Sequence, residues 1–237
     1  MGGRGRGSGQ AERTRREDLS GAPGYGGNAF PDSTGNHIVY SGGMSSDWDY
    51  DVDDEDAVIR DIRERFGVGM KAAMDDYRGV RAFTDYYYSG IRDAQKNGDT
   101  DGRYAEWGRQ AEKYIADGIK SGNGWNGGHT YRGIAVDDDT LQGLSRIGVG
   151  ENVNIHNGGS ASWATDVGTA RDFSHNGSGN NHVVFVNMDT SQRGVSVAGI
   201  SSNGFGEHEV LCSKDNQYKK VGQYSDGNYT YIYVRNA

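Results

Sequence analysis

The stretch YKKVGQYSDGNYTYIYV, residues 218–234, decides the fold class of this 237-residue chain. Its two halves, Tyr218–Tyr224 and Tyr229–Val234, are rich in the aromatic and β-branched residues that favour strands. The Asp226-Gly227-Asn228 segment between them is typical of a tight turn, so the stretch predicts an antiparallel hairpin. Alternating runs of the same kind predict further strands over Thr130–Val136, Asn152–His156, His182–Met188, Gly194–Ile200 and Glu209–Ser213.

The chain from residue 53 to residue 122 has a helical period instead. Apolar residues recur there every three or four positions, which predicts helices with one buried side. Gly67 is placed to end the first helix and Asp101 to cap the last, and one more short helix is expected over Asp166–Phe173. The apolar residues that mark these helices are Val58, Ile59, Ile62 and Phe66 in a first helix, Met70 and Met74 in a short second helix, Val80, Phe83, Tyr87 and Ile91 in a third, and Tyr104, Trp107, Ala111, Tyr114 and Ile119 in a fourth. Helices followed by a run of strands predict an α+β fold with mainly antiparallel sheets.

Composition divides the chain into a leader and one domain. The 39 glycines and the mean hydropathy of −0.81 approach the values of disordered chains, but 15 tyrosines, 6 phenylalanines and 4 tryptophans indicate a folded core. Residues 1–52 have no apolar period, so we expect a disordered, glycine-rich leader there. The domain is expected over 53–237, with a helical part over 53–122 and a β core over 129–237.

Charge, hydropathy and cysteine content argue against several classes of protein. No run approaches the roughly 18 apolar residues of a membrane span, and the first residues lack the apolar segment of a secretory signal, so we expect neither. The net charge of −8 argues against general nucleic-acid binding. The single cysteine, Cys212, excludes internal disulfides and a cysteine-based zinc site. The six histidines have no ligand spacing, so we expect no metal.

Two polar clusters lie at the edges of expected strands. Tyr131-Arg132-Gly133 places an arginine in an otherwise apolar or small-residue strand. A guanidinium there needs an anion such as a phosphate, or, as the commoner alternative, a salt bridge with one of the acidic residues. Gly159-Ser160-Ala161-Ser162 offers two hydroxyls, which can order a loop, bond a ribose or simply cap the following helix.

The third cluster is Gly204-Phe205-Gly206-Glu207-His208-Glu209. Glu207 and Glu209 lie two residues apart at the start of a strand, so their side chains share a face. Two carboxylates this close suit acid–base work or the stabilisation of a developing cation, whereas a solvated edge strand is the structural alternative. The glycine-rich loop that holds the aromatic Phe205 is typical of a mobile recognition loop, which weakens that alternative.

The order Arg, Ser-x-Ser and Glu-x-Glu resembles the Arg–Ser–Glu class of mono-ADP-ribosyltransferases, which includes actin-modifying binary toxins and bacteriophage enzymes. The resemblance covers about 180 residues, roughly 53–235, and Ala161 departs from it where the family has threonine. It implies N-terminal helices packed on a mainly antiparallel two-sheet β core. The stretches that carry it are Tyr77-Arg78-Gly79, Tyr131-Arg132-Gly133-Ile134, Ser160-Ala161-Ser162-Trp163 and Gly206-Glu207-His208-Glu209-Val210-Leu211.

The resemblance implies transfer of ADP-ribose from NAD+, the co-substrate, to an arginine of a target protein through an oxocarbenium-like transition state. By the family's pattern, Glu209 stabilises that transition state and Glu207 positions the acceptor; a glutamate at the latter place goes with arginine as acceptor. Arg132 holds a phosphate of the dinucleotide. Ser160 bonds near the nicotinamide ribose and helps to fix Glu209.

Three further roles follow from the resemblance. Asn157 matches an asparagine that some relatives use in binding NAD+, and Phe205 takes the place of an aromatic residue that recognises the target protein. The segment Ser174–Asn181 lies where the family has a loop over the phosphates and the nicotinamide. Arg171, near its start, is either a second phosphate contact or part of a structural salt bridge.

Two other functions stay open at this point: an NAD+ glycohydrolase with the same site, and an inactive transferase-like structural component of a virion. We expect a monomer that acts on a protein, with neither membrane nor nucleic acid as partner. The opening Gly-Gly-Arg-Gly resembles the starts of some phage minor head proteins. We therefore expect a virion-associated protein or one that acts in the cytoplasm of a bacterial host, ahead of a secreted toxin.

Overall fold

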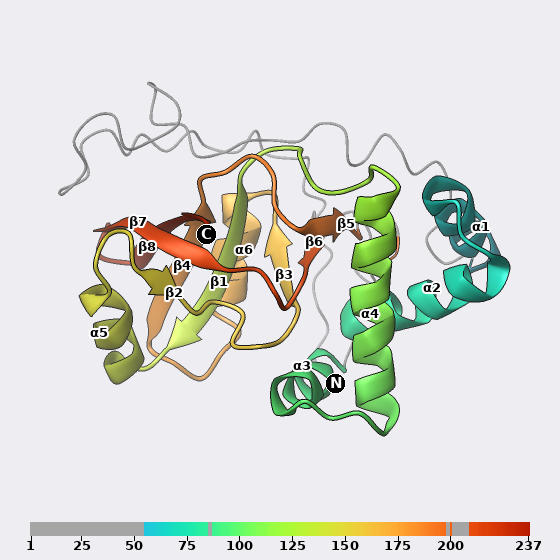
Figure 1. The fold of residues 1–237 in the computed structure, drawn as a ribbon. Coiled ribbons are helices and arrows are strands. Elements are labelled where there is room, and N and C mark those ends of the chain that lie inside the picture. Colours follow the sequence, from blue (N-terminus) through green and yellow to red (C-terminus); the bar gives the residue numbers. More distant parts are fainter. Residues whose placement is uncertain (1–54, 85–86, 198–199, 201–208) are drawn as a thin grey trace.

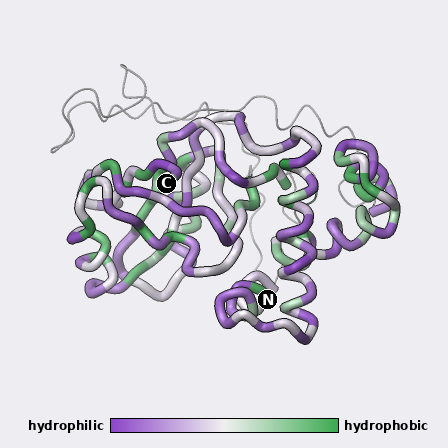
Figure 2. The backbone as a smooth tube through the Cα atoms, viewed as in Figure 1, coloured by the Kyte–Doolittle hydropathy of each residue, from purple (hydrophilic) through white to green (hydrophobic). Residues whose placement is uncertain are grey.

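The computed structural model describes residues 55–84, 87–197, 200 and 209–237 of the chain. Four helices come first: α1 (Glu55–Phe66), α2 (Met70–Thr84), α3 (Tyr88–Asn97) and α4 (Arg103–Lys120). They pack on one another; α4 lies between the strands and the helices α1 and α2, whereas α3 lies on the strand side of α4 (Figure 1). Along these helices apolar and polar residues alternate (Figure 2), and the apolar ones form a core with Val195, Val197 and Leu211 from the β half.

The helical period predicted α1 and α4 well and divided α2 wrongly. Gly67 ends α1 as expected, with a φ of +64° that favours glycine. Met70–Thr84 is one helix, where the sequence suggested a short helix and the start of another. Gly79 lies inside it because α4 crosses so closely that a Cβ there would be 2.5 Å from the Cβ of Gln110. Gly102, rather than Asp101, occupies the cap position of α4.

Eight strands follow, and hydrogen bonds join them in the order β2-β7-β8-β4-β1-β3-β6-β5. Every neighbouring pair is antiparallel except β4 with β8, which confirms the mainly antiparallel expectation. The strands are β1 (Thr130–Val136), β2 (Asn152–Val153), β3 (Ala161–Ala164), β4 (Asn181–Asn187), β5 (Gly194–Ser196), β6 (Glu209–Cys212), β7 (Tyr218–Ser225) and β8 (Tyr229–Asn236).

The expected two sheets are one continuous sheet in the structure, but the connection is narrow. β1 pairs with β4 along seven residues, whereas it pairs with β3 only at Tyr131 and Ala164. Beyond that pair β3 leaves β1 and continues with β6 and β5. Five strands and three strands therefore form two groups that meet at a single residue pair, and Arg132 directly follows one member of that pair.

Two short helices cover the sheet. α5 (Asp138–Arg146) was not expected; Asp137 caps it by accepting a hydrogen bond from the Thr140 amide, and its leucines pack on one face of the sheet. α6 (Val167–Ser174) begins after Asp166, close to the expected position, and packs against the opposite face. The hairpin of β7 and β8 is confirmed, with its turn at Gly227, whose φ is +94°.

Candidate active site

Glu209 is the first residue of β6 and is 5% exposed. β6 pairs with β3, and the hydroxyl of Ser162 on β3 donates a hydrogen bond to Oε1 of Glu209. Ser162 lies opposite Leu211, and Glu209 and Leu211 lie two residues apart on one face of β6. The strand pairing therefore fixes both the position of the carboxylate and the direction of the hydroxyl that holds it.

Arg132 reaches the same serine from β1. Its Nη1 donates a hydrogen bond of 2.7 Å to the carbonyl oxygen of Ser162. That carbonyl is available because β3 has already left β1 at this point, after the pair of Tyr131 and Ala164. Ser162 therefore connects Arg132 to Glu209, two residues that lie 77 positions apart in the sequence.

A second arginine lies close to Arg132 and comes from the helical part. Nη2 of Arg92, on α3, donates a hydrogen bond of 2.9 Å to the carbonyl oxygen of His156. Burial, together with the charge of the neighbouring Arg92, lowers the pKa of Arg132 to about 10, and burial likewise lowers the pKa of Arg92. Both shifts have burial as their largest cause, and the nearby charge of Arg92 adds to it for Arg132, so the two cations lie close together in a partly desolvated place.

No acidic residue of the described chain forms an ion pair with either arginine, so the salt bridge considered for Arg132 is not made there. Moreover, Nε of Arg92 and Nε of Arg132 are both buried without a hydrogen-bond partner among the residues that the structure describes. A buried guanidinium with unused donors is costly unless an anion satisfies it. The pair therefore has the chemistry of a site for a phosphate or diphosphate group.

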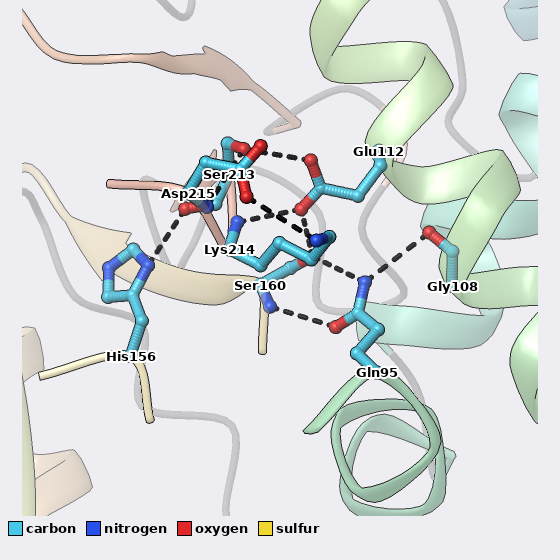
Figure 3. Close-up of polar contacts among 8 residues, drawn as sticks. All are labelled: Gln95, Gly108, Glu112, His156, Ser160, Ser213, Lys214 and Asp215. Atoms are coloured by element: carbon cyan, nitrogen blue, oxygen red, sulfur yellow. Dashed lines mark hydrogen bonds and ion pairs between the residues drawn. The ribbon is translucent and has the colours of Figure 1, made fainter. Parts of the chain in front are cut away.

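Ser160 has a different place from the one expected. It is fully buried, and its hydroxyl donates to Oε1 of Glu112 at 2.6 Å while accepting from Nε2 of Gln95 at 2.8 Å (Figure 3). Its amide donates to Oε1 of Gln95 at 2.8 Å. Ser160 precedes β3, two residues before Ser162, and its hydroxyl is bonded to Gln95 on α3 and Glu112 on α4. The expected hydrogen bond to Glu209 is made by Ser162 instead.

The remaining expected site residues fall in three groups. Asn157 is exposed, with a φ of +49°, and its amide is bonded to Asn154; it follows His156, which holds Arg92. Arg171 donates to the hydroxyl of Tyr231 and lies 5.1 Å from the ring centre of Tyr229. Glu207 and Phe205 lie outside the described residues.

The buried side chain of His156 forms hydrogen bonds with residues that lie next to the site. Burial, together with the positive charges of Arg132 and Arg92, lowers the pKa of His156 to about 3, so this imidazole is neutral. Its Nδ1 donates to the carbonyl oxygen of Ser213 at 2.9 Å. Its Nε2 accepts from Nε1 of Trp163 at 2.9 Å and from the hydroxyl of Tyr218 at 3.1 Å. The histidine therefore holds Trp163, the neighbour of Ser162, in place.

Sequence reasoning missed Arg92, Gln95, Glu112 and His156, because nothing in their local sequence marks them. Only the fold brings these residues to the ends of β1, β3 and β6. Over the part of the chain that the structure describes, no group of three histidines, cysteines or acidic residues is arranged to hold a metal ion. Within the same residues, no helix combines the length and the apolar character needed to cross a bilayer.

No protein-family model matches the sequence, and a search of curated proteins finds no match. Solved structures match at low identity. The ADP-ribosyltransferase HopU1 of Pseudomonas syringae pv. Tomato DC3000 superposes with a TM-score of 0.53, at 12% identity over 77% of this chain and 87% of that one. An ADP-ribosyltransferase from Clostridium botulinum superposes with a TM-score of 0.52, at 13% identity over 75% of this chain and 91% of that one. The Clostridium limosum C3 exoenzyme also superposes with a TM-score of 0.52, at 13% identity over 79% of this chain and 95% of that one. The described part of this chain therefore has an α+β fold that matches the fold of ADP-ribosyltransferases.

Proposed function

We propose that this protein is a mono-ADP-ribosyltransferase that transfers ADP-ribose from NAD+ to an arginine of a target protein. The observation that carries the proposal is the contact of Ser162 with both Arg132 and Glu209. Through this contact Arg132, a candidate to bind a phosphate, lies close to Glu209, a candidate carboxylate to stabilise the transition state. Both lie where the two groups of strands meet. The match of the fold to ADP-ribosyltransferases supports the same conclusion.

In the proposed reaction the bond between C1′ of the ribose and the nicotinamide nitrogen breaks, and its electron pair leaves with nicotinamide. Glu209 stabilises the positive charge that develops on the ribose, because its carboxylate is buried and held by Ser162. A guanidinium nitrogen of the acceptor then forms the new bond to C1′ and loses a proton. Glu207 takes the role of positioning this guanidinium and accepting the proton.

The residues of this chain fit the binding of NAD+. Arg132 and Arg92 offer two buried Nε–H groups that have no hydrogen-bond partner in the described part of the chain, and a diphosphate has acceptor oxygens for both. Asn157 lies one residue after the carbonyl that holds Arg92, so it is a candidate to complete that side of the site. Phe205 is the proposed contact with the target protein.

The test is to incubate the protein with NAD+ and agmatine, a small molecule with a guanidinium group, and to separate ADP-ribosyl-agmatine from free ADP-ribose. The proposal predicts the agmatine product from the parent and almost none from Glu209→Ala. Free ADP-ribose as the only product would favour the glycohydrolase. Absence of NAD+ consumption by the parent, with agmatine and with a bacterial lysate as acceptors, would overturn both activities and favour the structural role.

A further inference from the structure

A single carboxylate on α4 holds the ends of the two strands that carry the site. Glu112 accepts hydrogen bonds from the Ser160 hydroxyl at 2.6 Å, from the Ser213 hydroxyl at 2.8 Å and from the Lys214 amide at 2.7 Å (Figure 3). Ser160 comes immediately before β3, and Ser213 and Lys214 come immediately after β6. Three donors from two strands therefore converge on one side chain of the helical part.

The register of β3 and β6 places these donors at one end of the pair. Ala161 lies opposite Cys212, so Ser160 and Ser213 are the first residues beyond the ladder. At the other end of the same four-residue ladder, Glu209 lies opposite Ala164. The ladder is short and pairs with β1 at one residue pair, so the bonds to Glu112 add to the few other hydrogen bonds that hold it, those of Ser162 with Arg132 and of Trp163 with His156.

The hydrogen bonds around Ser160 leave its hydroxyl one orientation. Gln95, on α3, donates to the hydroxyl oxygen and accepts from the Ser160 amide, while the hydroxyl hydrogen is directed to Glu112. Gln95 lies one turn after Arg92 on the same helix. The contact that positions β3 therefore also sets the distance between Arg92 and the strands.

We propose that Glu112 is a positioning residue, which fixes the β3–β6 pair against α3 and α4 so that Ser162 directs Glu209 at the reacting ribose. The inference rests on the proposed function, because it assigns Glu112 an effect on that reaction. Glu112 acts through hydrogen-bond geometry and makes no contact with substrate. A glutamine at this position can keep the three bonds, since its oxygen replaces Oε1 and its amide donates to the Ser213 hydroxyl oxygen.

The test compares Glu112→Ala and Glu112→Gln with the parent, and uses Glu106→Ala as the matched control. Glu106 lies exposed on the same helix and accepts a 3.4 Å hydrogen bond from Gln110 of that helix. We expect Glu112→Ala to lower kcat for NAD+ consumption by about tenfold with KM changed less than about threefold, because transition-state stabilisation is lost while phosphate contacts remain. Glu112→Gln should stay within about threefold of the parent in kcat, and the control should match the parent.

Two further measurements separate positioning from a purely structural role. The effect of Glu112→Ala on kcat should shrink to less than about threefold in a Ser162→Ala background, because both changes act on Glu209. Hydrogen exchange of residues 160–164 and 209–213 should be faster in Glu112→Ala than in the parent, and this readout does not need turnover.

Each outcome decides the inference. An Ala variant with the parent's kcat, a Gln variant as impaired as the Ala variant, or additive effects with Ser162→Ala would overturn it. If the parent does not consume NAD+, the proposed function fails. Hydrogen exchange then decides separately whether Glu112 fixes the two strands, and unchanged exchange would overturn that as well.

Discussion

At the scale of single residues, the structure separates two serines that the sequence presents alike. Ser162 bonds the carboxylate of Glu209, whereas Ser160 bonds Glu112 and Gln95. We expect Ser162→Ala to lower kcat for NAD+ consumption by about tenfold or more, because a hydrogen bond to a charged group is worth about 1.5–3 kcal/mol. Ser160→Ala should cost about threefold or less, since Ser213 and Lys214 still bond Glu112.

Steady-state kinetics of both variants, at a temperature well below their unfolding transitions, checks this expectation. A larger loss for Ser160→Ala than for Ser162→Ala would show that the hydroxyl before β3 is the one that serves the reaction.

The two glutamates of the Glu-x-Glu motif should have separable roles. Glu207→Gln removes the carboxylate that pairs with and deprotonates the acceptor, and leaves Glu209 to stabilise the transition state. We expect transfer to agmatine to be abolished while much of the NAD+ hydrolysis is retained. Parallel assays of agmatine product and free ADP-ribose measure the two activities. Equal loss of both would contradict this division.

The two arginines that form no ion pair within the described part of the chain, Arg92 and Arg132, should govern NAD+ affinity. Arg92→Gln removes one of the two buried guanidinium groups without touching Glu209, so KM for NAD+ should rise by about tenfold, with a smaller change in kcat. Lys96→Gln is the matched control, because it removes one positive charge from an exposed position on the same helix. A rise in KM of the same size for both variants would mean that overall charge, and not the site, is responsible.

At the scale of elements, two glycines inside helices differ in the space around them, so replacing each with alanine should have opposite effects on stability. A Cβ at Gly79 on α2 would lie 2.5 Å from the Gln110 Cβ and 2.6 Å from the Ala111 backbone nitrogen, whereas a Cβ at Gly143 on α5 has open space. We expect Gly79→Ala to destabilise the fold by about 1–3 kcal/mol through overpacking. Gly143→Ala should stabilise it by up to about 1 kcal/mol through helix propensity.

Urea unfolding of both variants provides the free energies of unfolding. The packing of α2 on α4 would be wrong if Gly79→Ala proved as stable as the parent, because backbone atoms of α4 cannot move away cheaply.

The same elements show how far the sequence predicts this fold. Periodicity was sufficient where one side of an element is buried, as in α1, α4 and the β7–β8 hairpin. It failed at α2, where Met70 and Met74 were assigned to one helix and Val80 and Phe83 to the next, although all four lie on a single helix that crosses α4 closely at Gly79. It also missed α5, of whose residues none is fully buried and whose leucines contact the sheet only partly. Such contacts depend on the tertiary arrangement, and local pattern does not encode them.

The site was predicted in part for the same reason. Strand edges and residue types marked Arg132 and Glu209, and strand pairing brought them together. Which of Ser160 and Ser162 bonds Glu209 depends on the residue at which β3 begins. A run of glycine and serine residues does not specify that residue. Arg92, Gln95 and Glu112 lie on helices, 48 to 102 residues away from the residues of the strand half that they bond, and only the packing of α3 and α4 on the strands reveals them.

At the scale of the whole molecule, stability against pH depends on two buried groups with opposite effects. Burial raises the pKa of Asp76, on α2, from 3.8 to about 6, although Lys113 on α4 opposes this. The ionised carboxylate is therefore unfavourable in the folded state, so stability is lost as the pH rises from 3.8 through 6. Burial lowers the pKa of His156 from 6.5 to about 3, so its contribution is present above pH 6.5 and is lost as the pH falls towards 3.

Asp76→Asn separates these two effects. Asparagine has the shape of the protonated aspartic acid and does not ionise, so the variant should match the parent near pH 4 and exceed its free energy of unfolding above pH 7. The expected gain is about 3 kcal/mol at most, since each factor of ten in the ionisation equilibrium corresponds to about 1.4 kcal/mol. The contribution of His156 is the same in both proteins and cancels in their difference. Denaturant unfolding of both proteins between pH 4 and pH 8 measures that difference. A difference that does not change with pH would mean that Asp76 is solvated in the folded protein, and that α2 and α4 do not pack around it as described.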